Sequence, residues 1–203
     1  MTDNQILTAH ISSLERGTIF FAEDLEHLGI TPSFLRILLP EMAREGTLIV
    51  RLARGIYCFP KLSHDYPPQR LLPSPDEIAH AVAARWKVNI VPTSAHAAYL
   101  AGLYPFSANP YAYASDGSDQ VVHLQNGRDI VFVKRRSHKV YYFRSERLRN
   151  LSEGLRYLGP KQVGPEQKAV IGETLTMVSL EDFRHDILLM PAWIRELLIP
   201  MFS

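Results

Sequence analysis

The spacing of hydrophobic residues changes from helical to strand-like along the N-terminal third of the chain. Apolar side chains recur every three or four positions over 5–14 and again over 31–45, a stretch that opens with the helix-start signature Thr-Pro-Ser. Two β-rich runs, 47–52 and 56–59, then flank a short turn that contains glycine, which indicates a hairpin. Together with a short extended run and a small helix over 18–28, this order predicts a winged helix-turn-helix.

A proline-rich stretch separates this part of the chain from the rest. Four of the fourteen residues in 62–75 are proline, a density that neither a helix interior nor a central strand tolerates. We therefore predict a winged helix-turn-helix DNA-binding domain over 1–61, a linker over 62–74 and a C-terminal domain over 75–203.

Helical and strand patterns are mixed in the C-terminal part. The same rules predict helices at 74–86, 94–103, 145–158, 165–178 and 180–198, and strands at 90–92, 111–115, 120–125 and 129–135. Asn126-Gly127 between the last two strands predicts a type I′ hairpin turn. The fold class predicted is α+β: an N-terminal winged helix-turn-helix followed by an α/β C-terminal domain with a small mixed or antiparallel sheet.

Composition indicates an ordinary globular protein. Hydrophobic residues make up 46% of the 203 residues, charged residues make up 21%, and mean hydropathy is -0.07. The first residues lack a signal-peptide pattern, and the most apolar stretch, 187–194, is short and interrupted by Pro191. A single cysteine, Cys58, fits a reducing compartment. We expect a cytoplasmic protein that does not engage the membrane.

The predicted winged helix offers five candidate DNA-binding residues. Ser33, Arg36 and Ile37 are the outward positions near the start of the helix over 31–45, and Arg51 and Arg54 belong to the hairpin. However, residues 1–62 hold six basic and seven acidic side chains, a net charge of -1. Since phosphate contacts supply most non-specific affinity for DNA, this charge leaves a purely protein-binding role open.

Basic charge is concentrated further along the chain. Over 128–161 there are ten basic and three acidic residues, a local charge of +7, and the aromatic residues 141–143 lie among them. This pattern fits a second nucleic-acid surface, a surface for an acidic partner, or simply a solvated helix face. The candidate residues of this surface are Lys134, Arg135, Arg136, Lys139, Arg144, Arg147 and Arg149.

Motifs for catalysis are weak. His64-Asp65 and His185-Asp186 match the dipeptide of metal-dependent phosphohydrolases, but that chemistry needs further ligands at suitable spacings. The sequence contains no P-loop, GxGxxG or GxSxG motif. We therefore expect no catalytic residues, metal or cofactor. A nucleic-acid-processing enzyme would require several acids, or His64 and His185, to meet in one pocket.

Four segments together resemble a known family. They are FFAEDLEHLG (20–29), RLARGIYCFPK (51–61), PSPDEIAHAVAARW (73–86) and IVPTSAHAAYLAGL (90–103). In order and spacing they resemble the AbiE-type (AbiEi-like) antitoxins of bacterial type IV toxin–antitoxin systems and their DUF-class relatives. The segment HDILLMPAWI (185–194) is similar to the closing segment of that family.

The resemblance implies a non-catalytic antitoxin that also represses transcription. In such proteins the winged helix binds inverted repeats in the promoter of the operon, and the C-terminal domain counteracts a nucleotidyltransferase-like toxin without requiring direct contact. Repression would then depend on Ser33, Arg36, Arg51 and Arg54, and antitoxicity on the domain that begins near Pro75. The alternative is a winged-helix scaffold for protein contacts, or a transcriptional regulator without a toxin partner.

Overall fold

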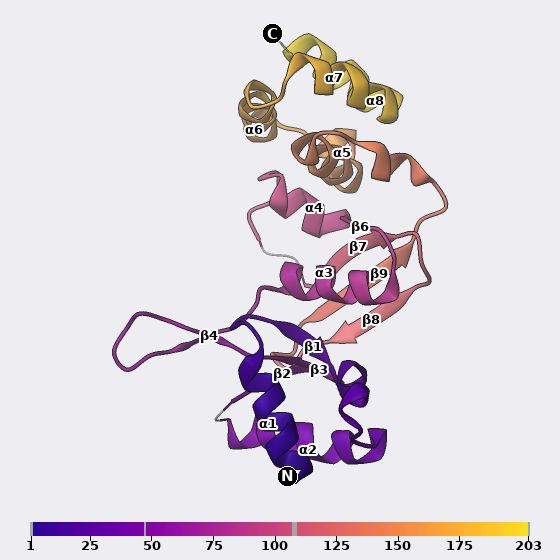
Figure 1. Ribbon diagram of the computed structural model, residues 1–203. Coiled ribbons are helices and arrows are strands. Elements are labelled where there is room, and N and C mark those ends of the chain that lie inside the picture. The colour runs from indigo at the N-terminus through magenta and orange to yellow at the C-terminus, as the bar shows by residue number, and fades with distance from the viewer. Residues whose placement is uncertain (1, 47, 107–108, 203) are drawn as a thin grey trace. The chain divides into compact units, whose positions relative to one another are not determined.

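The computed structural model of the chain describes residues 2–46, 48–106 and 109–202 (Figure 1). It forms two compact units. Unit 1 comprises Met1–Val82 and Val122–Arg128, and unit 2 comprises Ala83–Val121 and Asp129–Ser203. Helices and small sheets are both present, so the predicted α+β class is confirmed.

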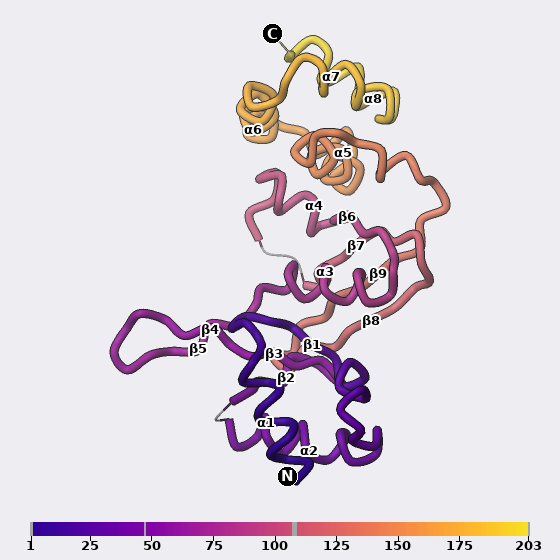
Figure 2. The backbone as a smooth tube through the Cα atoms, in the orientation of Figure 1, coloured from indigo at the N-terminus to yellow at the C-terminus, as the bar shows by residue number. Residues whose placement is uncertain are grey.

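The elements of unit 1 follow the predicted order through the first hairpin, and two unpredicted strands come after it. They are α1 (Asp3–Ser13), β1 (Ile19–Phe21), the 3-10 helix η1 (Ala22–Leu28), α2 (Pro32–Glu45), β2 (Val50–Ala53), β3 (Ile56–Cys58), β4 (Lys61–Leu62) and β5 (Arg70–Leu71). Thr47, in the run predicted as the first hairpin strand, lies outside the described residues. In place of an irregular linker after β3, β4 pairs antiparallel with β5, and this exposed hairpin projects from the rest of unit 1 (Figure 2).

Local signals explain where α2 begins and ends. The Thr31 side chain accepts a hydrogen bond from the Phe34 N–H (3.4 Å), and Gly46 ends the helix in the left-handed conformation (φ 66°), as a C-terminal glycine commonly does. Pro40 lies inside the helix without ending it. The helix buries Leu35, Leu38, Leu39 and Met42 in a core shared with α1, η1 and β3.

Cys58 lies on β3, the central strand of a sheet with the order β1-β3-β2, and it is fully buried. Burial, together with the nearby negative charge of Glu77, raises the pKa of the Cys58 thiol to about 11. Because the thiolate is the reactive form, we expect no reaction with DTNB in the native protein near pH 8 and one reactive thiol per chain after denaturation in guanidinium chloride. Rapid labelling of the native protein would contradict the buried position.

Unit 2 combines a small sheet with helices. Its elements are β6 (Ile90–Pro92), α4 (Ser94–Leu100), β7 (Tyr111–Ser115), β8 (Gln120–His123), β9 (Asp129–Lys134), η2 (His138–Tyr142), α5 (Glu146–Leu158), η3 (Pro160–Gln162), α6 (Pro165–Thr176), α7 (Leu180–Asp186), η4 (Ile187–Leu189), α8 (Ala192–Leu198) and η5 (Ile199–Met201). The division between the units falls within α3 (Pro75–Trp86), and β8 ends in unit 1.

The continuous helix predicted over 180–198 is wrong. The chain forms α7 and α8, separated by η4 and by Met190 and Pro191, which have extended ψ angles of 155° and 151°. Proline restricts the residue before it to extended backbone, and it cannot donate the hydrogen bond that a helix interior requires. The apolar periodicity continues across this break because both helices bury residues in one core. That core includes Leu148, Leu151 and Leu155 of α5.

The sheet is mixed, with the strand order β6-β7-β9-β8. β6 pairs antiparallel with β7, and β7 pairs parallel with β9. Tyr113 and Phe132 on neighbouring strands are both buried, and their rings stack with centroids 6.0 Å apart. No helix in the described ranges combines the length and apolar character that a bilayer span requires.

The turn between β8 and β9 differs from the predicted type. Gly127 has a φ of 78°, whereas Asn126 is not among the left-handed residues, so the type I′ prediction is wrong. The Gly127 N–H donates to the Leu124 carbonyl (3.1 Å), and the Asn126 side chain accepts from the Arg128 N–H (3.1 Å). The Asn126 amide therefore stabilises a turn in which only the glycine needs a positive φ.

Residues of this turn extend the sheet of unit 1. Leu124 forms an antiparallel bridge with Ala53, and the Gln125 N–H donates to the Leu52 carbonyl (2.9 Å). β2 lies at an edge of its sheet, so this contact satisfies backbone groups that the edge would otherwise leave unpaired.

Candidate functional site

Three of the predicted DNA-binding residues share one exposed face of α2. Ser33, Arg36 and Ile37 are spaced by three and four residues, which places them together on the surface of a helix. All three are exposed, and Ile37 exposes 55% of its surface although α2 buries four other large apolar residues. The structure therefore brings these residues together, as the sequence predicted.

The two predicted hairpin arginines differ in environment. Arg51 is half-buried, lies opposite Tyr57 in the β2–β3 ladder, and donates from Nε to the Ala53 carbonyl (3.3 Å). Burial raises the pKa of Tyr57, and the positive charge of Arg51 opposes that shift. Arg54 is exposed in the turn, next to Gly55 with its φ of 76°. Arg54 is thus exposed to solvent, whereas Arg51 is partly held by the hairpin.

A hollow of about 470 Å³ lies between the second half of α2 and β2. Arg51 and Arg44 both line it, whereas Ser33, Arg36, Ile37 and Arg54 do not. The full lining is Pro40, Glu41, Ala43, Arg44, Val50, Arg51 and Gln125.

Of the seven residues that line this hollow, only Arg51 was predicted as a site residue, and two of the other six, Arg44 and Gln125, differ in how far the sequence indicates them. Arg44 follows Ile37 by seven residues, so helical spacing could have placed it on the same side of α2. Gln125 comes from the β8–β9 turn, and no local pattern in the sequence indicates that this turn joins unit 1.

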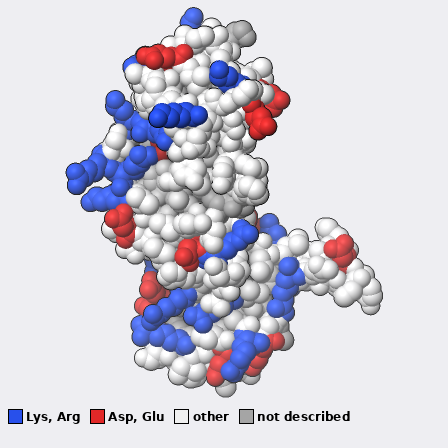
Figure 3. All heavy atoms as spheres, turned by 180° about the vertical axis from the view of Figure 1, so that it is seen from behind, with Lys and Arg blue, Asp and Glu red and all other residues white. Residues whose placement is uncertain are grey.

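Several residues of the predicted basic surface in unit 2 form ion pairs with acidic side chains. Arg135 forms an ion pair with Glu153, whose side chain is only 5% exposed. Arg144 forms an exposed ion pair with Glu181 (2.8 Å). Figure 3 shows Lys and Arg side chains gathered along one side of unit 2, with acidic side chains beside them. Glu153 is already counted in the local charge of +7, whereas Glu181 lies outside 128–161 and offsets one further basic residue of this surface.

The side chain of Arg149 is also partly buried, with 21% of its surface exposed. Its guanidinium lies 3.8 Å from Glu146, and burial lowers its pKa while the charge of Glu146 opposes the shift. Four of the seven candidates are exposed and lie outside the ion pairs of Arg135, Arg144 and Arg149: Lys134, Arg136, Lys139 and Arg147. Arg147 and Arg135 line different hollows, so the candidates do not share one binding pocket.

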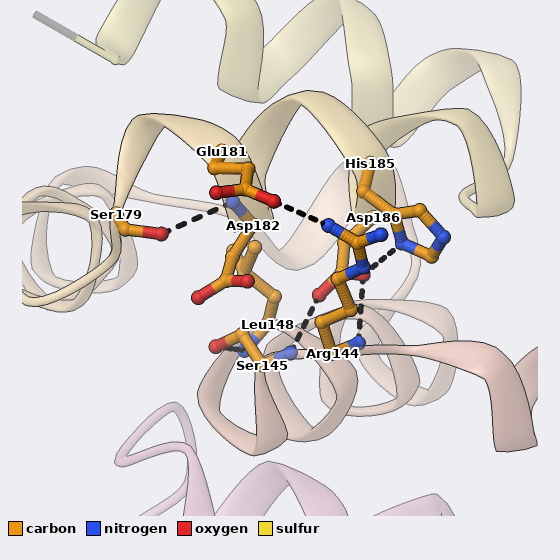
Figure 4. Close-up of polar contacts among 8 residues, drawn as sticks. All are labelled: Arg144, Ser145, Leu148, Ser179, Glu181, Asp182, His185 and Asp186. Atoms are coloured by element: carbon orange, nitrogen blue, oxygen red, sulfur yellow. Dashed lines mark hydrogen bonds and ion pairs between the residues drawn. The ribbon is translucent and has the colours of Figure 1, made fainter.

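The His185-Asp186 dipeptide stabilises the packing of α7 on α5 (Figure 4). Asp186 is fully buried, and its carboxylate accepts hydrogen bonds from the backbone N–H groups of Arg144 (2.9 Å) and Ser145 (2.8 Å). His185 Nδ1 lies 2.8 Å from the same carboxylate. Ser145 in turn caps α5, because its side chain accepts from the Leu148 N–H (3.3 Å). This carboxylate therefore has a structural role.

The other dipeptide, His64-Asp65, lies exposed in the β4–β5 hairpin of unit 1. Across the ranges that the structure describes, no group of three or more His, Cys, Asp or Glu residues is arranged to hold a metal ion. The geometry gives no positive support to the phosphohydrolase interpretation.

Comparison with protein-family models shows the family to which the chain belongs. A model described as "Family of unknown function (DUF6088)" matches residues 5–183. The chain belongs to the DUF6088 family. The DUF6088 match includes the exposed face of α2, the hairpin, and the part of unit 2 from β6 to α6. No curated protein matches the sequence.

Proposed function

We propose that this DUF6088 protein is a DNA-binding antitoxin that represses its own promoter through a winged helix-turn-helix in unit 1. The exposed row Ser33, Arg36 and Ile37 on α2 is the observation that supports DNA binding most directly. The order α1, β1, η1, α2 and the β2–β3 hairpin also supports it, because a winged helix places a recognition helix before a hairpin wing.

The chemistry of this row suits the major groove. An arginine such as Arg36 can donate two hydrogen bonds to guanine, and an aliphatic side chain such as Ile37 can pack on the methyl group of thymine. The hydroxyl of Ser33 suits a phosphate oxygen, and Arg54 suits the DNA backbone or the minor groove. Because residues 1–62 carry a net charge of -1, affinity would depend on binding two copies to inverted repeats.

The antitoxin role is supported by the resemblance of four sequence segments to AbiE-type antitoxins. Under this proposal unit 2 counteracts a nucleotidyltransferase-like toxin without requiring direct contact, and the protein carries out no catalysis itself. Co-expression with a nucleotidyltransferase-like toxin from the same operon would test this role, since under the proposal growth should recover only when this protein is present.

The DNA-binding role is tested by an electrophoretic mobility shift titration with the DNA immediately upstream of the coding sequence. We expect Arg36→Ala to weaken the specific shift about ten- to a hundredfold, because a bidentate base contact is lost. The control is Arg184→Ala, an exposed arginine on α7 that should leave the shift unchanged. A shift that is equal for unrelated DNA, or unaffected by Arg36→Ala, would refute recognition by α2.

A protein-binding scaffold is the second candidate. The exposed apolar residues Phe34 (39%) and Ile37 (55%) on α2, with the near-neutral charge of this region, favour it. In that case Ile37→Ser should abolish capture of a partner protein, while no specific DNA shift is seen at low salt.

A further inference from the structure

A hollow of about 350 Å³ in unit 2 includes Arg135, one of the predicted basic-surface residues, and shares no residue with the exposed face of α2. Three segments that are distant in the sequence form its walls: the turn from β6 into α4, the end of β9, and the last turns of α5. Its lining residues are Thr93, Ser94, Val133, Arg135, Glu153, Arg156 and Tyr157.

The buried carboxylate of Glu153 contacts three other residues that line this hollow. Glu153 accepts a hydrogen bond from the Thr93 hydroxyl (2.8 Å) and forms an ion pair with Arg135, while Arg156 Nε lies 3.6 Å from its other oxygen. Arg135 Nη2 also lies 3.4 Å from the Thr93 hydroxyl oxygen. Two guanidinium groups therefore surround one carboxylate, which leaves a surplus of one positive charge.

The two arginines retain hydrogen-bond donors for a ligand. A guanidinium carries five N–H groups. Within the described ranges, Arg135 uses only Nη2 in these contacts and Arg156 uses only Nε. Their side chains are 30% and 44% exposed, so the remaining N–H groups are accessible to a ligand from solvent. Because Glu153 and Thr93 hold Arg135 in place, less side-chain entropy is lost when it binds an anion.

Ser94 contributes a hydroxyl from a strained backbone position. Its φ is 56°, in the left-handed region that residues other than glycine, asparagine and aspartate rarely adopt. Strain of this kind is concentrated at functional sites, where a side chain must be held in one place. Ser94 is exposed and lines the hollow beside Arg135 and Arg156.

We propose that this hollow binds a terminal phosphate group, carried either by a mononucleotide or by the end of a nucleic-acid strand. Arg135 and Arg156 supply charged donors that match phosphate oxygens, and Ser94 supplies a neutral donor. Tyr157, which is 49% exposed, offers an aromatic face for the base or sugar attached to that phosphate. The residues of this site are all in unit 2, and none belongs to the face of α2 that we propose to bind DNA.

Isothermal titration calorimetry with the full chain tests the proposal, using inorganic phosphate, 5′-AMP and adenosine at constant ionic strength. We expect both phosphate probes to bind and adenosine not to bind. A 5′-phosphorylated and a 5′-hydroxyl oligonucleotide of the same sequence distinguish the sources. Tighter binding of the phosphorylated strand than of both 5′-AMP and the 5′-hydroxyl strand indicates a strand end, whereas tighter binding of 5′-AMP than of the phosphorylated strand indicates a mononucleotide. Absence of binding by every phosphate probe, or equal binding of adenosine and 5′-AMP, would overturn the site.

Two variants make the test specific. Arg156→Gln keeps the Glu153–Arg135 pair and should weaken 5′-AMP binding about tenfold. The matched control Arg184→Gln, on α7 and outside the hollow, should bind as the unaltered chain does.

Ser94→Gly separates folding from binding. It removes the hydroxyl and also relieves the left-handed strain, so we expect an unchanged or higher Tm together with weaker 5′-AMP binding. If Arg156→Gln and Ser94→Gly both bind 5′-AMP as tightly as the unaltered chain, the polar cluster is structural and the proposal is wrong.

Discussion

Asp186→Ala is expected to destabilise unit 2 by about 3 to 5 kcal/mol, because two backbone N–H groups lose a charged acceptor. These groups belong to Arg144 and Ser145 at the start of α5, and the carboxylate that binds them is fully buried. Alanine also leaves a small cavity between α7 and α5. Guanidinium chloride denaturation followed by circular dichroism measures the loss, and amide hydrogen exchange should accelerate at Arg144 and Ser145.

Glu181→Ala is the matched control for this prediction. Glu181 lies on the same helix and contacts the same segment, since it pairs with the Arg144 side chain (2.8 Å), but its side chain is 83% exposed. Exposed ion pairs contribute about 0 to 1 kcal/mol, so the control should hardly change the free energy of unfolding. Similar losses for both variants would show that Asp186 does not act through its buried hydrogen bonds.

Gly154→Ala is expected to destabilise unit 2 by about 2 to 3 kcal/mol, although alanine normally favours a helix over glycine. An added Cβ at Gly154 in α5 would lie 2.8 Å from the Cα and 3.1 Å from the N of Ala98 in α4. These are backbone atoms, so the two helices would have to separate. The change in unfolding free energy from denaturant titration measures the effect.

A second helical glycine provides the comparison. Gly172 lies within α6, and an added Cβ there would meet no atom within 4 Å. Gly172→Ala should therefore stabilise the protein by about 0.5 to 1 kcal/mol, through reduced backbone entropy of the unfolded chain. Opposite signs at the two glycines are the expected result. A stabilising effect at both would mean that α4 and α5 are packed less closely than the structure shows.

Local chemistry was sufficient to predict most elements of the fold. The cap at Thr31, the proline after it and the glycine at position 46 define α2 without reference to any other part of the chain. The failures depend on longer-range effects. The periodicity over 180–198 reports which side chains are buried, and it is insensitive to a backbone break at Pro191 when both helices pack on the same core.

The candidate sites were predictable only where one element supplies them. Ser33, Arg36 and Ile37 could be grouped because they follow helical spacing on α2. The acceptor of the Arg144 and Ser145 N–H groups comes from Asp186, more than forty residues away, and Thr93 meets Glu153 across sixty positions. The local charge count included Glu153 but could not show that it pairs with Arg135, and Glu181, the partner of Arg144, lies outside the counted stretch.

Residues 122–128 belong to unit 1 although unit 2 begins before them, and this affects both folding during synthesis and the choice of stable fragments. The segment that pairs with Leu52 and Ala53 follows them by about seventy positions, with residues 83–121 of unit 2 between. During synthesis from the N-terminus, the edge of β2 stays uncovered until the ribosome has released residues beyond Arg128. A fragment cut after the β4–β5 hairpin would keep the exposed residues of α2 that we propose to bind DNA but would expose a strand edge, and such edges favour aggregation.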